Sequence, residues 1–280
     1  KALYDSLSGE RGIFSREAST NKAKENGRRN TKRSDGKTWQ YGTNPCSEII
    51  LRPNQFCNLT EVMVRSTDTL DELQNKVRLA TILGTYQSTL TDFKYLRKKW
   101  QFNTEEERLL GVSLTGIMDS LLTNGKAYKD VENGLKETLT TLKNTSIETN
   151  KEFAKKLKIN ASVAITCVKP SGTVSQLTDT ASGIHARHSE YYMRRVRGDM
   201  KDKLTQFLRD SGVSFENAIS GFEDLDQKKP IYNDEMGVFS FPIKAPNNCV
   251  TRDDEVAIDQ LKLWLSYYRY WCEHKPSITV

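Results

Sequence analysis

The chain has 280 residues, 36% of them hydrophobic, which is enough to bury one large core or two ordinary ones. Its formal net charge is +6, and no stretch approaches the roughly 20 apolar residues that span a bilayer, which excludes a membrane-spanning helix. The five cysteines are odd in number and include no CxxC pair. This argues against a secreted disulfide framework and a zinc ribbon, and favours a reducing, cytoplasmic location.

The first 43 residues are polar and predict mostly loop with short helical pieces. Within them, residues 16–37 hold eight Lys and Arg against three Asp and Glu. This run is either a solvated surface or a binding surface for a phosphate-rich partner. The sequence has neither a starting Met nor a signal-peptide pattern, and we expect it to begin inside a longer gene product.

The most informative pattern follows in residues 42–51, which read GTNPCSEIIL. If this backbone is extended, Asn44, Cys46 and Glu48 point to one face. A carboxylate beside a thiol disfavours the thiolate, so this thiol suits hydrogen-atom donation better than ionic attack. Glu48 would then handle a substrate proton, and Asn44 would orient a hydroxyl. Taken alone, the spacing has a high chance of being accidental.

Cys57 lies eleven residues after Cys46. A tight turn at Pro53 and Asn54 would bring the chain back beside its starting strand and Cys57 near the Cys46 sulfur. The alternative is two unrelated buried cysteines, because free cysteine is among the most buried residue types.

Capping boxes and apolar periodicity predict long helices in the middle of the chain, and β-rich runs predict strands after it. The predicted elements are helices at 69–98, 104–122, from 130 onward, 200–210 and 251–272, and strands at 162–168, 191–196, 236–243 and 277–280. Strands separated by helices indicate an α/β fold, either a barrel or a large part of one.

A candidate phosphate site follows the strand predicted at 162–168. Pro170, Ser171, Gly172 and Thr173 lead into a polar helical start. Glycine lets a backbone approach a ligand closely, and the N–H groups at a helix start can hold an anion. The alternative is a simple capped helix. The segment is not a Walker A motif, because no GK[ST] follows the glycine.

Residues 182–197 are dense in Arg, His and Tyr, which suits binding of phosphates, bases and sugars. The alternative is an ordinary strand with solvated arginines. His185 and His188 lack a third ligand nearby, so we reject a metal site. Together, the residue types imply a phosphorylated substrate whose hydroxyls are handled by a thiol, a carboxylate and an amide.

At this point the sequence resembles the adenosylcobalamin-dependent ribonucleoside-triphosphate reductases, the monomeric class II ribonucleotide reductases. The similar segments are residues 7–18, 42–53, 55–61, 110–116, 169–177, 182–197 and 271–277. The resemblance implies a ten-stranded α/β barrel that encloses a finger loop with a radical cysteine. On this basis the chain is a partial catalytic barrel, with a polar segment at 1–43, the finger loop at 44–61, a helical part at 62–160 and an α/β part at 161–280.

By the same resemblance, Cys46 is the thiyl radical that abstracts the 3′ hydrogen, Glu48 is the base at the 3′ hydroxyl, and Asn44 binds the ribose hydroxyls. Cys57 is one half of the reducing dithiol. The substrate phosphates lie on Pro170, Ser171, Gly172 and Thr173. The implied cofactor is adenosylcobalamin, the substrate a ribonucleoside triphosphate, and the external reductant thioredoxin or a similar dithiol. No membrane or nucleic acid partner is expected.

Some features depart from the family pattern. The partner thiol of Cys57 and a C-terminal cysteine pair are expected outside this sequence. Ala186 and His188 flank Arg187 where proline and an aromatic residue are expected, and Lys275 stands in place of asparagine. We therefore also consider a split or truncated fragment that is inactive without an N-terminal partner chain. A basic nucleic-acid-binding module is the third hypothesis, which explains the charge but leaves the thiol–carboxylate pattern unexplained.

Overall fold

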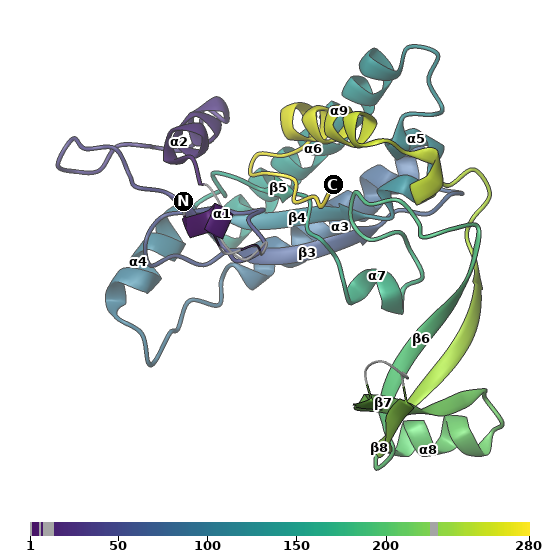
Figure 1. Ribbon diagram of the computed structural model, residues 1–280. Coiled ribbons are helices and arrows are strands. Elements are labelled where there is room, and N and C mark those ends of the chain that lie inside the picture. The colour runs from purple at the N-terminus through teal and green to yellow at the C-terminus, as the bar shows by residue number, and fades with distance from the viewer. Residues whose placement is uncertain (1, 6, 8–13, 225–228) are drawn as a thin grey trace. The chain divides into compact units, whose positions relative to one another are not determined.

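The computed structural model describes residues 2–5, 7, 14–224 and 229–280 (Figure 1). The chain divides into two compact units, unit 1 with Lys1–Arg187 and Asn247–Val280, and unit 2 with His188–Pro246. Residues 8–13, part of the first family-like segment, lie outside the described residues.

The described helices and strands of unit 1 are α1 (Ala2–Asp5), α2 (Arg16–Glu25), β1 (Gly42–Thr43), β2 (Ile50–Leu51), β3 (Asn58–Met63), α3 (Leu70–Gln87), α4 (Lys98–Glu107), β4 (Leu110–Thr115), η1 (Ile117–Asp119), α5 (Leu121–Asn124), α6 (Val131–Leu157), β5 (Thr166–Cys167), α7 (Val174–Leu177), η2 (Arg252–Asp254) and α9 (Ala257–Tyr270). Those of unit 2 are β6 (Tyr191–Asp199), α8 (Lys203–Asp210), β7 (Phe215–Asp224) and β8 (Lys229–Lys244). No described helix is long and apolar enough to cross a membrane.

Unit 1 is built on a parallel sheet with strand order β3-β4-β5 (Figure 1). β3 pairs with β4 along its whole length, from Asn58 opposite Leu110 to Met63 opposite Thr115. Every residue of β4 is buried, as expected for the central strand of a parallel sheet covered on both faces. The predicted α/β class is confirmed.

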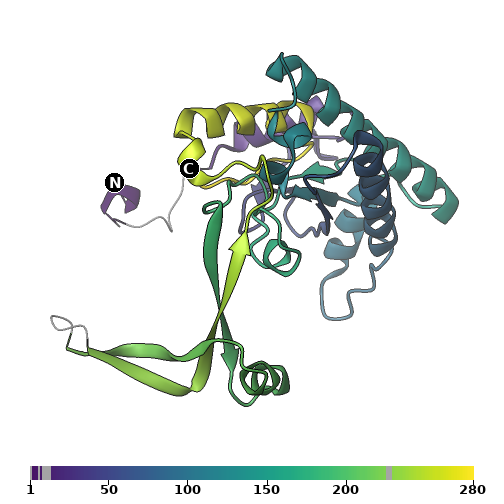
Figure 2. The same ribbon diagram turned by 90° about the vertical axis from the view of Figure 1, so that its right-hand side faces the viewer.

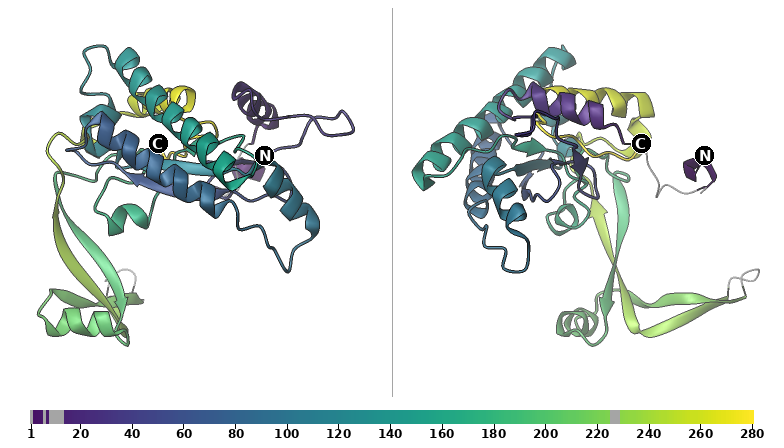
Figure 3. Two further views of the ribbon diagram at one scale, coloured as in Figure 1. Left: turned by 180° about the vertical axis from the view of Figure 1, so that it is seen from behind. Right: turned by 90° about the vertical axis from the view of Figure 1, so that its left-hand side faces the viewer.

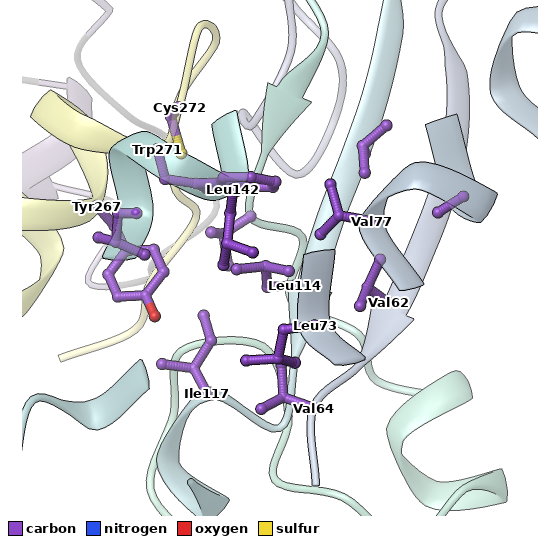
Figure 4. Close-up of a cluster of buried hydrophobic side chains, with 14 of the residues drawn as sticks. Val62, Val64, Leu73, Val77, Leu114, Ile117, Leu142, Tyr267, Trp271 and Cys272 are labelled. Carbon is purple, nitrogen blue, oxygen red and sulfur yellow. The ribbon is translucent and has the colours of Figure 1, made fainter. Parts of the chain in front are cut away.

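Helices cover one face of this sheet. Val62 of β3 and Leu114 of β4 pack against Leu73 of α3 and Leu142 of α6 in one buried cluster, with Trp271 beyond the end of α9 (Figure 4). The left view of Figure 3 shows α3 and α6 side by side over this face. Because side chains alternate along a strand, the residues between these point to the opposite face. We call that opposite face the inner face, and it carries Leu59, Glu61, Gly111, Ser113 and Cys167.

The helix predicted at 104–122 is wrong. α4 ends at Glu107, and Arg108 follows in the left-handed conformation with φ 42°. The next residues are an uninterrupted buried run that forms β4, a pattern that a buried helix shares. Glu107 does not cap a helix, because its carboxylate lies in a buried ion network described below.

Two other capping predictions had different outcomes. Thr69 and Glu72 form the expected capping box, but α3 ends at Gln87, well before residue 98. Thr251 and Asp254 also form a capping box, yet it opens only the short η2, and α9 begins at Ala257. Asp130 caps α6 as predicted, with its side chain accepting from the Asn133 N–H. The expected strand at 277–280 is absent from this described segment, and only Pro276 forms an isolated bridge, with Val168.

Unit 2 is an antiparallel sheet with strand order β6-β8-β7. Figure 2 shows its long twisted ribbon with α8 beside it. The strands predicted at 191–196 and 236–243 are confirmed and extend further. β7 was not predicted, because its sequence lacks regular alternation. Its pairing with β8 contains three register shifts, which explains the irregular pattern.

Candidate functional site

A short turn carries the three side chains that were expected to share one face. β1 and β2 pair as a hairpin, with Gly42 opposite Leu51, which leaves residues 44–49 as the connecting loop. Ser47 has φ 70°, and its N–H donates to the Asn44 carbonyl at 3.0 Å. The extended strand predicted here is therefore wrong. The chain reverses instead, and family-like residues 44–48 lie at the tip of the hairpin.

The side chains on this turn differ in solvent exposure. Cys46 is exposed, whereas Glu48 is only 1% exposed. The Asn44 Oδ1 atom accepts from the Ile49 N–H at 3.0 Å, so this amide stabilises the turn. Within the described residues, Glu48 Oε2 is buried without a hydrogen-bond partner. A buried carboxylate oxygen in that state is costly, and a ligand hydroxyl would satisfy it.

The segment after α9 holds this turn. The Lys275 N–H donates to the Glu48 carbonyl at 3.0 Å, and its Nζ donates to Ser47 Oγ at 3.2 Å. Burial lowers the pKa of Lys275, and the Glu48 carboxylate opposes that shift. Lys275, a departure from the family pattern, thus contacts the turn directly.

His274 joins the hairpin to the sheet. Its Nδ1 accepts from the Ile50 N–H at 3.3 Å, and its Nε2 lies 3.0 Å from the Leu110 carbonyl. An N–H group can only donate, which assigns the ring proton to Nε2. Burial lowers the pKa of His274 to about 3, so the ring is neutral. It fixes β2 against β4 without adding a charge.

A buried ion network holds the other side of the hairpin. The Glu107 carboxylate pairs with Arg29 at 2.7 Å and Arg52 at 2.8 Å, and accepts from Gln55 Nε2 at 2.7 Å. Arg29 also donates to the Ile50 carbonyl at 2.9 Å. Arg28 pairs with the buried Glu273 at 2.7 Å. Arg28 and Arg29, two of the basic residues in the run at 16–37, are therefore engaged with buried carboxylates.

Cys57 lies directly before β3 and is half-buried. Burial raises the pKa of its thiol, the Arg29 charge opposes this, and the Glu48 carboxylate adds to it. A neutral S–H group thus lies within electrostatic range of Glu48. The chain turns with Asn54 at φ 60°, but β3 then pairs with β4. The expected return beside the starting strand is wrong.

The candidate phosphate loop follows β5. Ser171 is buried with φ 56°, and its hydroxyl has no hydrogen-bond partner among the described residues. Gly172 and Thr173 are exposed, and Pro170 is half-buried. In the described part of the chain, the N–H groups of 171–173 donate no hydrogen bond. α7 has only four residues, so free N–H groups, more than a helix dipole, are what this loop offers an anion.

The segment at 182–197 is divided between the two units. Its most buried arginine, Arg187, is engaged in ion pairs within the protein. Arg187 binds both oxygens of Asp119 at 2.9 Å, and it also pairs with Asp179 at 2.9 Å. His185 Nε2 accepts from the Thr279 N–H at 2.9 Å. Among the described residues, no group of three or more His, Cys, Asp or Glu is placed to hold a metal.

One polar pair on the inner face was not predicted from the sequence. Glu61 of β3 lies 3.4 Å from Lys169, whose own N–H donates to Ser113 Oγ at 2.9 Å. Alternation of Gly111, Ser113 and Thr115 with Val112 and Leu114 would have placed Ser113 on the inner face, whereas residues 59–63 do not alternate. The helix predicted over 104–122 conceals that alternation.

Comparisons with known proteins identify the family of the chain. A family model described as ribonucleotide reductase, barrel domain, matches residues 17–162. The chain is 28% identical to the adenosylcobalamin-dependent ribonucleoside-triphosphate reductase of Lactobacillus gasseri, over 85% of this chain and 33% of that protein. It is 27% identical to the reductase of the same name from Euglena gracilis, over 85% of this chain and 30% of that protein.

Solved structures are also similar. A crystal structure of a B12-dependent, class II ribonucleotide reductase aligns with TM-score 0.68 and 25% identity, over 85% of this chain and 35% of that one. The class Id ribonucleotide reductase alpha subunit of Actinobacillus ureae aligns with TM-score 0.50 and 16% identity, over 91% of this chain and 50% of that one, which supports the fold alone. The chain thus spans about a third of the length of the curated relatives it matches.

Proposed function

We propose that this chain, which belongs to the ribonucleotide reductase barrel-domain family, forms part of the active site of an adenosylcobalamin-dependent ribonucleoside-triphosphate reductase. The reaction replaces the substrate's 2′ hydroxyl with hydrogen, releases water, and oxidises two thiols to a disulfide. The observation that carries the proposal is the buried, unpartnered Glu48 oxygen on the same turn as the exposed Cys46.

The three predicted side chains on the turn would then act as follows. Cys46, as a thiyl radical, removes the 3′ hydrogen atom of the ribose and returns a hydrogen atom at the end. Glu48 Oε2 accepts the 3′ hydroxyl proton, for which it has a free lone pair. Asn44 uses Oδ1 to hold the turn, which leaves its Nδ2 group to donate to a ribose hydroxyl.

Cys57 supplies one of the two thiols that reduce the substrate. Its raised pKa keeps the sulfur protonated, as a donor of hydrogen requires. The second thiol belongs to another part of the complete enzyme, and the resulting disulfide is reduced by thioredoxin or a similar dithiol. A reducing cytoplasm suits this chemistry.

Adenosylcobalamin, when bound, supplies the radical that removes the hydrogen atom from the Cys46 thiol. The exposed position of Cys46 fits this role, because a thiol enclosed by its own chain is closed to a separate cofactor. The loop of Pro170, Ser171, Gly172 and Thr173 would receive the substrate phosphates through its free N–H groups.

The test is a turnover assay of the full-length enzyme with a ribonucleoside triphosphate, adenosylcobalamin and a dithiol. Cys46→Ser should abolish deoxynucleotide formation, because a hydroxyl is a far poorer hydrogen-atom donor than a thiol. Cys249→Ser is the matched control, since Cys249 is half-buried and outside the proposed site, and it should keep activity. An active Cys46→Ser enzyme would remove this residue from the mechanism. We expect the 280 residues alone to form no product, because their relatives are about three times as long.

A further inference from the structure

The inner face holds a charged pair to which the proposed reaction assigns no role. Glu61 is buried, with its side chain 7% exposed, and Lys169 is 25% exposed. Their closest atoms are 3.4 Å apart, longer than the 2.7–2.9 Å usual for strong charge-assisted hydrogen bonds. In the described residues, the other Glu61 oxygen is buried without a partner. The lysine is therefore only loosely held by this carboxylate.

Lys169 lies at the start of the candidate phosphate loop. Its N–H is fixed by Ser113 Oγ at 2.9 Å. Its carbonyl lies so close to Gly183 that a Cβ on that glycine would approach it within 3.0 Å. The backbone of Lys169 is thus held at its N–H and its carbonyl, while its side chain keeps access to solvent.

The same lysine shares a neighbour with the proposed catalytic groups. The buried Cys167 thiol is within electrostatic range of Glu48 and Cys57, and also of Lys169. Arg187, a cation C-terminal to the loop, is held by Asp119 and Asp179. Lys169 is thus a partly exposed cation on the inner face, at the start of the loop.

We propose that Lys169 binds the polyphosphate of the substrate nucleotide and that Glu61 holds the lysine in the unliganded enzyme. This inference rests on the proposed function for the identity of the substrate. A phosphate oxygen replaces the weak carboxylate contact, so the Lys169 ammonium exchanges one anionic partner for another. Lys169 is in this view a binding residue, and Glu61 is a competitor that sets its availability.

The test compares Lys169→Met and Glu61→Gln in the full-length enzyme. Direct binding of a ribonucleoside triphosphate and of the matching unphosphorylated nucleoside is measured by calorimetry, and KM and kcat are measured separately. Lys169→Met should weaken triphosphate binding about 10- to 100-fold, the effect of losing a hydrogen bond to a charged group, and leave nucleoside binding unchanged. Glu61→Gln should tighten triphosphate binding several-fold, and Lys169→Arg should restore most of the affinity.

The two variants separate binding from a structural role. If both weaken triphosphate binding alike and lose the same thermal stability, the pair is structural and the inference is wrong. If the wild-type enzyme turns over triphosphates but Lys169→Met binds them normally, the inference fails while the proposed function stands. If Lys169→Met loses triphosphate binding in an enzyme without reductase activity, the inference stands and the proposed function fails.

Discussion

Replacement of Gly183 by alanine tests whether a close backbone approach positions the phosphate loop. Gly183 is buried with φ 55°, and a Cβ there would meet the Lys169 carbonyl at under 3.0 Å and the Pro170 carbonyl at 3.3 Å. The matched control is Gly27, which has a similar φ of 66° but nothing within 4 Å of the point where a Cβ would lie. Both variants force alanine into the left-handed region, but only one creates a clash with backbone.

The magnitudes follow from that difference. Left-handed backbone costs alanine about 1–2 kcal/mol, and this is the whole effect expected for Gly27→Ala. Overpacking adds about 1–3 kcal/mol, so Gly183→Ala should lower the free energy of unfolding by about 2–5 kcal/mol. Because the clash displaces the carbonyl of Lys169, Gly183→Ala should also raise the KM for the triphosphate, whereas Gly27→Ala should not.

The assay is urea unfolding of the full-length protein, with KM measured on the folded variants. Equal destabilisation by the two substitutions would show that the close backbone approach at Gly183 adds no steric cost. An unchanged KM in a clearly destabilised Gly183→Ala protein would show that the loop position is independent of this contact. Either result would refute the reasoning that Gly183 clamps the start of the phosphate loop.

Three further predictions concern stability. Glu107→Ala should cost about 3–5 kcal/mol in urea unfolding because it leaves the buried Arg29 charge without its carboxylate, while Arg52 keeps Glu106; Glu106→Ala, at a 44% exposed side chain, should cost at most about 1 kcal/mol. The pKa of His274 is about 3 when folded, against 6.5 as its ordinary value, so only the unfolded chain takes up this proton between those pH values. The contribution of neutral His274 to the free energy of unfolding is therefore fully present above pH 6.5. It falls on acidification, by up to about 1.4 kcal/mol per pH unit. His274→Gln should flatten this pH dependence when the free energy of unfolding is measured across that range. Gly84→Ala should raise the free energy of unfolding by about 0.5–1 kcal/mol, because the site is inside α3 and the nearest atoms to the new Cβ are at 3.5 Å. The thermal midpoint should rise accordingly, and a lower midpoint would contradict this.

The sequence predicted those elements whose signals are local. The capping box at Thr69 and the N-cap at Asp130 both open helices where expected, since a cap is read from three or four neighbouring residues. The strand at 110–115 was missed because the capping pattern at Thr104 favoured one helix running through it, although Leu110, Val112 and Leu114 alternate with smaller or polar residues. Only the pairing of this run with β3 and β5, far away in sequence, makes it a strand.

The sequence predicted which residues form the candidate site better than it predicted how the backbone arranges them. Asn44, Cys46 and Glu48 do lie together on one short loop, but the alternation rule placed them on a strand. Pro45 and the left-handed Ser47 instead produce a reversal, which the rule for extended backbone does not cover. The roles of His274 and Glu107 depend on contacts with residues more than 70 positions away, and local patterns contain no sign of them.

These distant contacts explain how an exposed turn can keep the geometry proposed for catalysis. A loop of six residues with an exposed tip would ordinarily be mobile, and a displacement of about 1 Å can cost a hundredfold in rate. Here the turn is fixed at its base from two directions, by the neutral His274 on β2 and by the Arg29–Glu107 pair behind it. Both anchors act on the backbone of one residue, Ile50, through its N–H and its carbonyl respectively. The exposed thiol thus stays open to the proposed cofactor while its position is set by buried groups, and loosening either anchor should lower turnover before it unfolds the protein.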